Sequence, residues 1–112
     1  MSFSLETEKL VNELIQAEYK NACEKFGDKY HSLHEAYAVL LEEVEEANTE
    51  FKIVKSWKRI LWAKLRNIDF QFYSEKEIIE KLQKTTENTI KELAQVGAVL
   101  MKIQNTCSEE KE

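Results

Sequence analysis

Apolar residues recur every three or four positions along almost the whole chain, which is the spacing of one face of an α-helix. The first such stretch runs from about Leu5 to Phe26, and Ser4 precedes it as a candidate N-cap. Gly27 follows, where many helices end in a residue with a positive φ angle. The sequence therefore predicts a first helix over these residues and a loop from Gly27 to His31.

A second helix is predicted to open with a capping box. Ser32 and Glu35 have the spacing at which the hydroxyl caps the third amide and the carboxylate reaches back to the cap amide. Apolar residues then continue in threes and fours, so we predict one long helix from about Leu33 to Ile68. A break near Lys55 is the main alternative.

The third predicted helix begins near Ser74 or Glu75 and runs to about Asn105, with 108–112 as a frayed polar tail. Its apolar residues alternate in threes and fours, which is typical of a coiled-coil seam. This pattern gives the chain three long helices with few residues between them.

Part of the third helix is apolar on nearly every side. Between Leu93 and Leu100 only Gln95 is polar, and Gly97 permits close approach of another backbone. An all-round apolar helix has to be covered on every side, which three helices of one short chain cannot easily do. We therefore expect a homo-oligomer, either a dimer or a tetramer.

The composition supports an all-α fold. The 112 residues include no proline and two glycines, so the chain has few residues suited to tight turns. We predict a single domain over 1–112, an antiparallel helical bundle of about three long helices that is completed by oligomerisation.

Charge and targeting signals narrow the functional classes. The net charge of −5 makes nucleic-acid binding unlikely, because such binding favours a basic surface. The N-terminus carries no basic segment followed by an apolar one, and no apolar run is long enough for a membrane span. Cys23 and Cys107 are interpreted as free thiols. We expect a soluble, cytoplasmic protein without membrane contact.

An acidic cluster occupies the first half of the second predicted helix. It consists of Glu42, Glu43, Glu45, Glu46 and Glu50. Side chains three or four residues apart on a helix are close enough to share a divalent cation, and oxygen ligands suit Mg²⁺. The alternative is a solvated acidic face, which is common because glutamate favours helices.

A second polar group lies on the third helix. Asn88, Glu92 and Gln95 share one face, beside the most apolar stretch of the chain. A half-buried carboxylate is costly unless it is paired or bound to a metal. The alternative is that Glu92 pairs with a lysine or arginine and that Gln95 satisfies a backbone group.

A basic stretch follows the acidic cluster. It has no acid between Phe51 and Ile68, and its cations are Lys52, Lys55, Lys58, Arg59, Lys64 and Arg66. With Trp57 and Trp62 interleaved, these residues could hold phosphates and stack on a base. The preferred interpretation is a surface whose positive charges pair with the acids of a neighbouring helix or subunit, with the tryptophans in the core or an interface. A nucleic-acid-binding segment is a weaker third idea.

Two segments resemble a known family. The run from His34 to Ala47, with Glu42-Glu43-x-x-Glu46 in it, resembles the first metal-binding helix of the all-α NTP pyrophosphohydrolases of the MazG-like group, in particular its small phage- or prophage-type members. The run Glu92-Leu-Ala-Gln-Val-Gly-Ala98 resembles the later helix that completes the site. The resemblance covers roughly residues 30–105.

The resemblance implies a Mg²⁺-dependent enzyme, with Mn²⁺ as a possible substitute. It would hydrolyse nucleoside triphosphates between the α and β phosphates to a monophosphate and pyrophosphate, with house-cleaning of the nucleotide pool as the suggested role. The implied metal ligands are Glu43, Glu46 and Glu92, with Glu42 as a further ligand or a base that orients water. Within the basic stretch, Lys55 and Arg59 are candidate phosphate contacts.

The sequence departs from the family pattern at one position. Gln95 stands where the second motif commonly has an aspartate. An amide oxygen can bind a cation but adds no charge, so we include Gln95 as a weaker ligand. The alternative function is a catalytically degenerate helical oligomer that acts as an interaction or nucleotide-binding protein.

Overall fold

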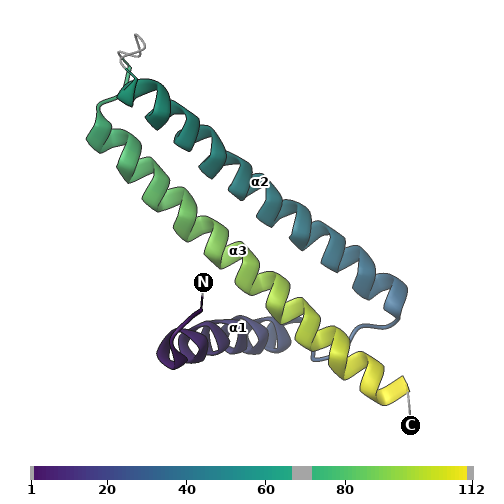
Figure 1. Ribbon diagram of the computed structural model, residues 1–112. Helices are drawn as coiled ribbons and strands as arrows, with labels where there is room; N and C mark the ends of the chain where they lie inside the picture. The colour runs from purple at the N-terminus through teal and green to yellow at the C-terminus, as the bar shows by residue number, and fades with distance from the viewer. Residues whose placement is uncertain (1, 67–71, 111–112) are drawn as a thin grey trace. The chain divides into compact units, whose positions relative to one another are not determined.

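The computed structural model describes residues 2–66 and 72–110, with the side chains of 109 and 110 left out. The described residues form three helices, which are α1 (Leu5–Phe26), α2 (Leu33–Leu65) and α3 (Glu75–Glu110) (Figure 1). The predicted all-α fold with three long helices is confirmed.

The first helix begins and ends as local chemistry predicts. The Thr7 backbone N–H donates to the Ser4 hydroxyl at 3.1 Å, which is an N-cap. At the other end, Gly27 has a φ angle of 82° and its N–H donates to the carbonyl of Cys23. A positive φ angle costs glycine little because it has no Cβ.

The second helix is continuous. The Glu35 N–H donates to the Ser32 hydroxyl at 3.1 Å, which is the hydroxyl half of the predicted capping box. No break occurs near Lys55, and α2 runs on to Leu65. The predicted end at Ile68 lies outside the described residues.

The third helix has a complete capping box at its start. The Glu77 N–H donates to the Ser74 hydroxyl at 3.1 Å, and the Ser74 N–H donates to the Glu77 carboxylate at 3.3 Å. The helix ends at Glu110, so the predicted end at Asn105 is wrong. The helix includes 108–110, which the sequence pattern predicts as part of a frayed tail.

The chain forms two compact units. Unit 1 comprises Met1–Val44 and Leu93–Glu112, and therefore contains α1, the start of α2 and the second half of α3. In this unit α1 and α3 pack closely, because a Cβ added to Gly97 would lie 2.9 Å from the Ile15 side chain. The close approach predicted at Gly97 is thus made by a helix of the same chain.

Unit 2 comprises Glu45–Glu92 and is a helical hairpin, in which α2 and α3 run side by side in opposite directions (Figure 1). Ala47 and Ile78 are its buried apolar residues among those described. Near the turn, the rings of Trp57 and Tyr73 meet edge to face with centroids 5.0 Å apart. Trp57 is therefore a packing residue, in line with the preferred interpretation of the tryptophans.

Many large apolar side chains stay exposed in the single chain. The buried apolar residues among those described are Ala36, Ala47, Ile78, Ala94 and Ala98, which is a core made mostly of alanine. By contrast, Trp62 and Leu93 are each more than half exposed, at 60% and 55%. Such exposure is consistent with the predicted homo-oligomer, which stays a prediction.

No described helix is both long enough and apolar enough to cross a lipid bilayer.

Candidate functional site

Three glutamates that the sequence analysis selected lie together. One carboxylate oxygen from each of Glu43, Glu46 and Glu92 lies within 4.8 Å of the other two. Glu43 and Glu46 come from successive turns of α2, and Glu92 comes from α3. We call these three residues the glutamate cluster.

Helical periodicity explains half of this geometry and hairpin packing explains the rest. Residues three apart on a helix are neighbours on its surface, so Glu43 and Glu46 are adjacent wherever α2 lies. Glu92 is 46 positions after Glu46 in the sequence and reaches it because α3 runs back along α2 in the hairpin of unit 2.

The electrostatics of the glutamate cluster are unfavourable for a bare chain. Burial raises the pKa of Glu92 above its ordinary value, and the charges of Glu46 and Glu50 raise it further. A side-chain hydrogen bond with Glu46 acts in the same direction. Glu46 and Glu92 together therefore favour the binding of positive charge, which either a proton or a metal ion can supply.

The donor set of the glutamate cluster fits a hard divalent cation. Mg²⁺ takes oxygen ligands at about 2.0–2.1 Å in octahedral geometry, so two ligand oxygens are at most about 4.2 Å apart. Of three such oxygens at least two pairs are cis, at about 2.9 Å, so the carboxylates, which lie within 4.8 Å of one another, would have to draw together by side-chain rotation around one ion. Because Glu46 is exposed and the other two are half-buried, room remains for waters and phosphate oxygens in the coordination sphere.

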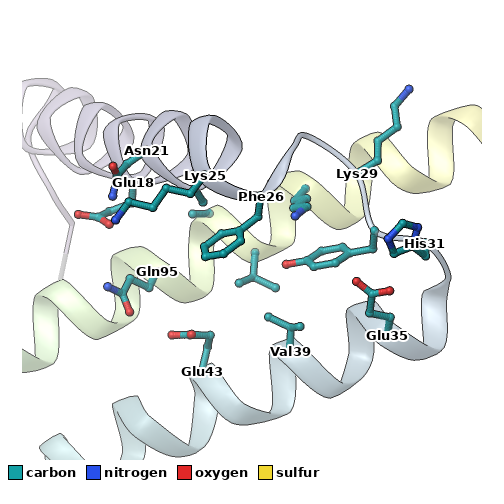
Figure 2. A pocket seen from close by; sticks show the side chains of 15 residues that line it. Glu18, Asn21, Lys25, Phe26, Lys29, His31, Glu35, Val39, Glu43 and Gln95 are labelled. Atoms are coloured by element: carbon teal, nitrogen blue, oxygen red, sulfur yellow. The ribbon is translucent and has the colours of Figure 1, made fainter.

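A pocket of about 590 Å³ lies in unit 1 and includes Glu43 in its lining (Figure 2). Its walls come from the end of α1, the following loop, the start of α2 and the second half of α3. Glu43, Val39 and Glu35 line it from α2, and Gln95 lines it from α3. Glu43 therefore belongs to both the glutamate cluster and the pocket.

A buried lysine lines this pocket, beside the acidic side chains of Glu18, Glu35 and Glu43. Lys102 lines it and is 8% exposed, with its ammonium 4.3 Å from the centroid of the Tyr30 ring. Within residues 2–66 and 72–110, no carboxylate forms a salt bridge with Lys102 and its ammonium makes no hydrogen bond. Among these residues, every side-chain nitrogen that is fully buried has a hydrogen-bond partner. Because the Lys102 ammonium has none, it is not fully buried and keeps some contact with solvent. A cation held in this way is available to a negatively charged ligand.

Two aromatic residues line the same pocket. Tyr30 is fixed by its backbone N–H, which donates to the Thr106 hydroxyl of α3 at 3.0 Å. Burial raises the pKa of the Tyr30 hydroxyl, and the charges of Glu43 and Glu35 raise it further. Phe26 projects from the end of α1 toward the middle of the pocket (Figure 2). These two rings offer apolar surface to a planar ligand group.

The other predicted site residues lie outside the glutamate cluster. Glu42 is exposed on α2, whereas Gln95 is half-buried and lines the pocket. Lys55 and Arg59 are exposed and do not line the pocket, and the Lys55 ammonium lies 5.0 Å from the centroid of the Phe51 ring. The roles suggested for these four residues stay predictions.

Three lysines that line the pocket are not among the site residues predicted from the sequence, namely Lys25, Lys29 and Lys102. A signal for Lys102 was present, because it follows Ala98 and Val99 at four and three positions and so shares their apolar face. A charged residue on such a face needs a partner or an opening to water. Lys25 and Lys29 flank Gly27, and only the chain reversal there places them at a pocket.

Comparison with known proteins adds no relative, since the chain matches no family model, no curated protein and no solved structure.

Proposed function

We propose that this protein is a Mg²⁺-dependent nucleoside triphosphate pyrophosphohydrolase, which converts a nucleoside triphosphate to the monophosphate and pyrophosphate. The observation that carries the proposal is the convergence of Glu43, Glu46 and Glu92. Three converging carboxylates are a donor set for Mg²⁺, and Mn²⁺ is a plausible substitute.

The reaction is a displacement at the α-phosphorus. The oxygen of a water molecule bonds to that phosphorus, and the bond to the oxygen that bridges the α and β phosphates breaks. Pyrophosphate leaves with the bridging oxygen, and the proton of the water passes to a carboxylate, for which Glu42 is the candidate from the sequence. Bound Mg²⁺ would neutralise phosphate oxygens and lower the pKa of water.

The residues of the chain would chiefly bind and position the substrate, as is usual in phosphoryl-transfer enzymes. The glutamate cluster would hold the cation, and Lys102 would offer its charge to a phosphate or carbonyl oxygen. Tyr30 and Phe26 would offer their rings to the base. The pocket volume of about 590 Å³ falls within the usual range for small-molecule sites.

Pyrophosphate release tests this proposal directly. The purified chain is incubated with each common ribo- and deoxyribonucleoside triphosphate and Mg²⁺, beside a reaction that contains EDTA. We expect Mg²⁺-dependent turnover with at least one nucleotide, and Glu43→Gln should lower kcat/KM by about 100-fold or more because it removes a charged ligand.

A matched control is Glu87→Gln, which makes the same change on an exposed part of α3 outside the glutamate cluster. It should keep the parent activity. If no nucleotide is turned over, or if Glu43→Gln and Glu87→Gln behave alike, the proposal is wrong.

The exposed apolar surface favours a second candidate, a helical interaction protein without turnover. Phe26, Trp62 and Leu93 are each more than half exposed in the chain alone, and Gln95 removes one charge from the resembled motif. For this candidate the melting temperature should not respond to Mg²⁺ or to nucleotide, whereas a ligand that binds only the folded state must raise it.

A further inference from the structure

One exposed face of α2 has the spacing of a coiled-coil seam. Its members alternate in threes and fours and are all exposed: Leu41, Val44, Asn48, Phe51, Lys55, Lys58, Trp62 and Leu65. We call this set the α2 stripe. It is apolar at both ends and more polar in the middle, where Lys55 lies over the ring of Phe51.

The hairpin of unit 2 is short of buried apolar surface without a partner. Of its described apolar residues Ala47 and Ile78 are buried, whereas Phe51, Trp62 and Leu65 are 43%, 60% and 56% exposed. Two antiparallel helices cannot enclose a core, and a bundle of four commonly does. Apolar residues at helical spacing therefore call for another helix against the α2 stripe.

The distribution of charge along α2 indicates which helix packs on the α2 stripe and in which direction it runs. Residues 42–50 carry five glutamates and no base, whereas residues 51–66 carry six lysines and arginines and no acid. A parallel copy of α2 would place acid against acid and base against base. An antiparallel copy places the acidic half of each helix against the basic half of the other.

We propose that α2 packs antiparallel against α2 of a second copy of this chain, through the α2 stripe. The two-fold axis passes beside Ile53. This register places Leu41 against the partner's Leu65 and Val44 against the partner's Trp62. Each apolar end of the stripe then covers the opposite apolar end, and Phe51 meets the partner's Lys55 at the centre.

Shifting one helix by a heptad gives a worse match in either direction. A shift one way places Val44 against the partner's Lys55 and Leu41 against the partner's Lys58. Lysines then face the apolar ends of the stripe, whereas the proposed register has a lysine against an apolar side chain only at the centre, where Phe51 meets the partner's Lys55. A shift the other way places Lys55 against the partner's Lys58, twice by symmetry. The proposed register is the one in which apolar residues meet apolar residues at both ends.

Charges beside the stripe support the same register. Glu45, Lys52 and Arg59 follow one another at intervals of seven on one flank and are exposed. In an antiparallel pair this flank meets its own copy, so Glu45 lies near the partner's Arg59, twice by symmetry. Near the axis, Lys52 lies beside the partner's Lys52.

Charge reversal with rescue tests the register. The association of the full chain is measured by analytical ultracentrifugation over a range of concentrations, for the parent, for Glu45→Arg, for Arg59→Glu and for the double variant. We expect the parent to form dimers or larger even-numbered oligomers. Each single variant should raise the dissociation constant of the α2–α2 contact by about tenfold, because both symmetric pairs become like-charged. The double variant should return to the parent value.

Two controls accompany these variants. Glu24→Arg makes a similar charge change on an exposed position of α1 and should leave association unchanged. Lys52→Gln removes the like-charge contact at the axis and should tighten association. Circular dichroism checks that each variant keeps its helices.

Four results would overturn the proposal. A parent that is monomeric at every concentration rules out the contact. An oligomer that is indifferent to both single variants uses another face. If the single variants weaken association and the double variant does not restore it, this register is excluded. If the protein is a monomer that binds DNA in a salt-dependent way, the basic half of α2 serves a different partner. None of these readouts depends on catalysis, so the proposed α2–α2 contact is tested independently of the proposed activity.

Discussion

One carboxylate oxygen of Glu46 in α2 and one of Glu92 in α3 lie within 4.8 Å of each other, although both side chains are acids. Two carboxylates this close can share a hydrogen bond only when one of them is protonated, because ionised carboxylates are acceptors alone. The structure therefore brings together two groups that repel each other in their usual ionised form. A proton or a metal ion relieves this repulsion, and several predictions depend on which of the two is present.

Without metal, stability should fall as the pH rises through the pKa of Glu92. The pKa of this group in the folded chain lies above its ordinary value of 4.5, so the folded state binds more protons than the unfolded state between the two pKa values. The stabilisation that Glu92 contributes is fully present below its pKa in the unfolded chain. It is lost as the pH rises through its pKa in the folded chain. Glu92→Gln should flatten this part of the pH dependence.

The measurement is urea unfolding in EDTA at a series of pH values from about 4 to 8. Groups away from the glutamate cluster contribute equally to the parent and to Glu92→Gln, so the difference between the two curves reports Glu92 together with its interaction with Glu46 and Glu50. Parallel curves would contradict the raised pKa.

Added Mg²⁺ should raise the melting temperature of the parent at neutral pH. A ligand at 100 times its dissociation constant stabilises the folded state by about 2.7 kcal/mol. Glu46→Gln and Glu92→Gln should abolish most of this rise, because each removes one carboxylate of the glutamate cluster. Differential scanning calorimetry with and without Mg²⁺ provides the measurement, and Glu87→Gln should respond as the parent does.

Lys102→Met should weaken nucleotide binding without loss of stability. The methionine keeps most of the length and can pack on Tyr30 but carries no charge, so KM should rise by about tenfold. The melting temperature should stay the same or rise, since no ion pair of Lys102 is lost within the described chain. Lys20→Met, an exposed change on α1, is the control. A fall in melting temperature with unchanged KM would give Lys102 a structural role only.

Gly97→Ala should destabilise the protein. The added Cβ would lie 2.9 Å from two carbons of the Ile15 side chain, so the packing of α1 on α3 has to shift. Overpacking of this kind costs about 1–3 kcal/mol, and the better helix propensity of alanine offsets at most about 1 kcal/mol.

A double-mutant cycle with Ile15→Ala isolates the steric part of this change, because that variant removes the carbons that the new Cβ meets. Unfolding free energies of the four proteins should show a favourable coupling between the two substitutions. Additive effects would contradict the close contact.

The helices could be predicted closely from the sequence. Ser4, Ser32 and Gly27 act on atoms within four residues of themselves, so the starts of α1 and α2 and the end of α1 follow from local chemistry. The end of α3 was predicted too early because the polar residues after Asn105 carry no breaker, and the helix continues to Glu110.

The glutamate cluster was predicted in part by physics and in part by resemblance. The adjacency of Glu43 and Glu46 follows from the period of a helix. Periodicity by itself could not select Glu92, whose position depends on how α3 slides along α2. The polar face of the third helix indicates Glu92 as a candidate, and the resemblance to a known family assigns it to the same metal ion as Glu43 and Glu46.

What the sequence determined by itself was the set of helices and which of their faces are apolar, because these depend on neighbours within one or two turns. Only the tertiary structure decided that Glu92 meets Glu46, and that the Tyr30 N–H bonds to Thr106, 76 positions away. It also decided that the Lys102 ammonium lies over the Tyr30 ring. Such pairings depend on packing between distant segments, whose register is set by many small contacts that no local pattern encodes.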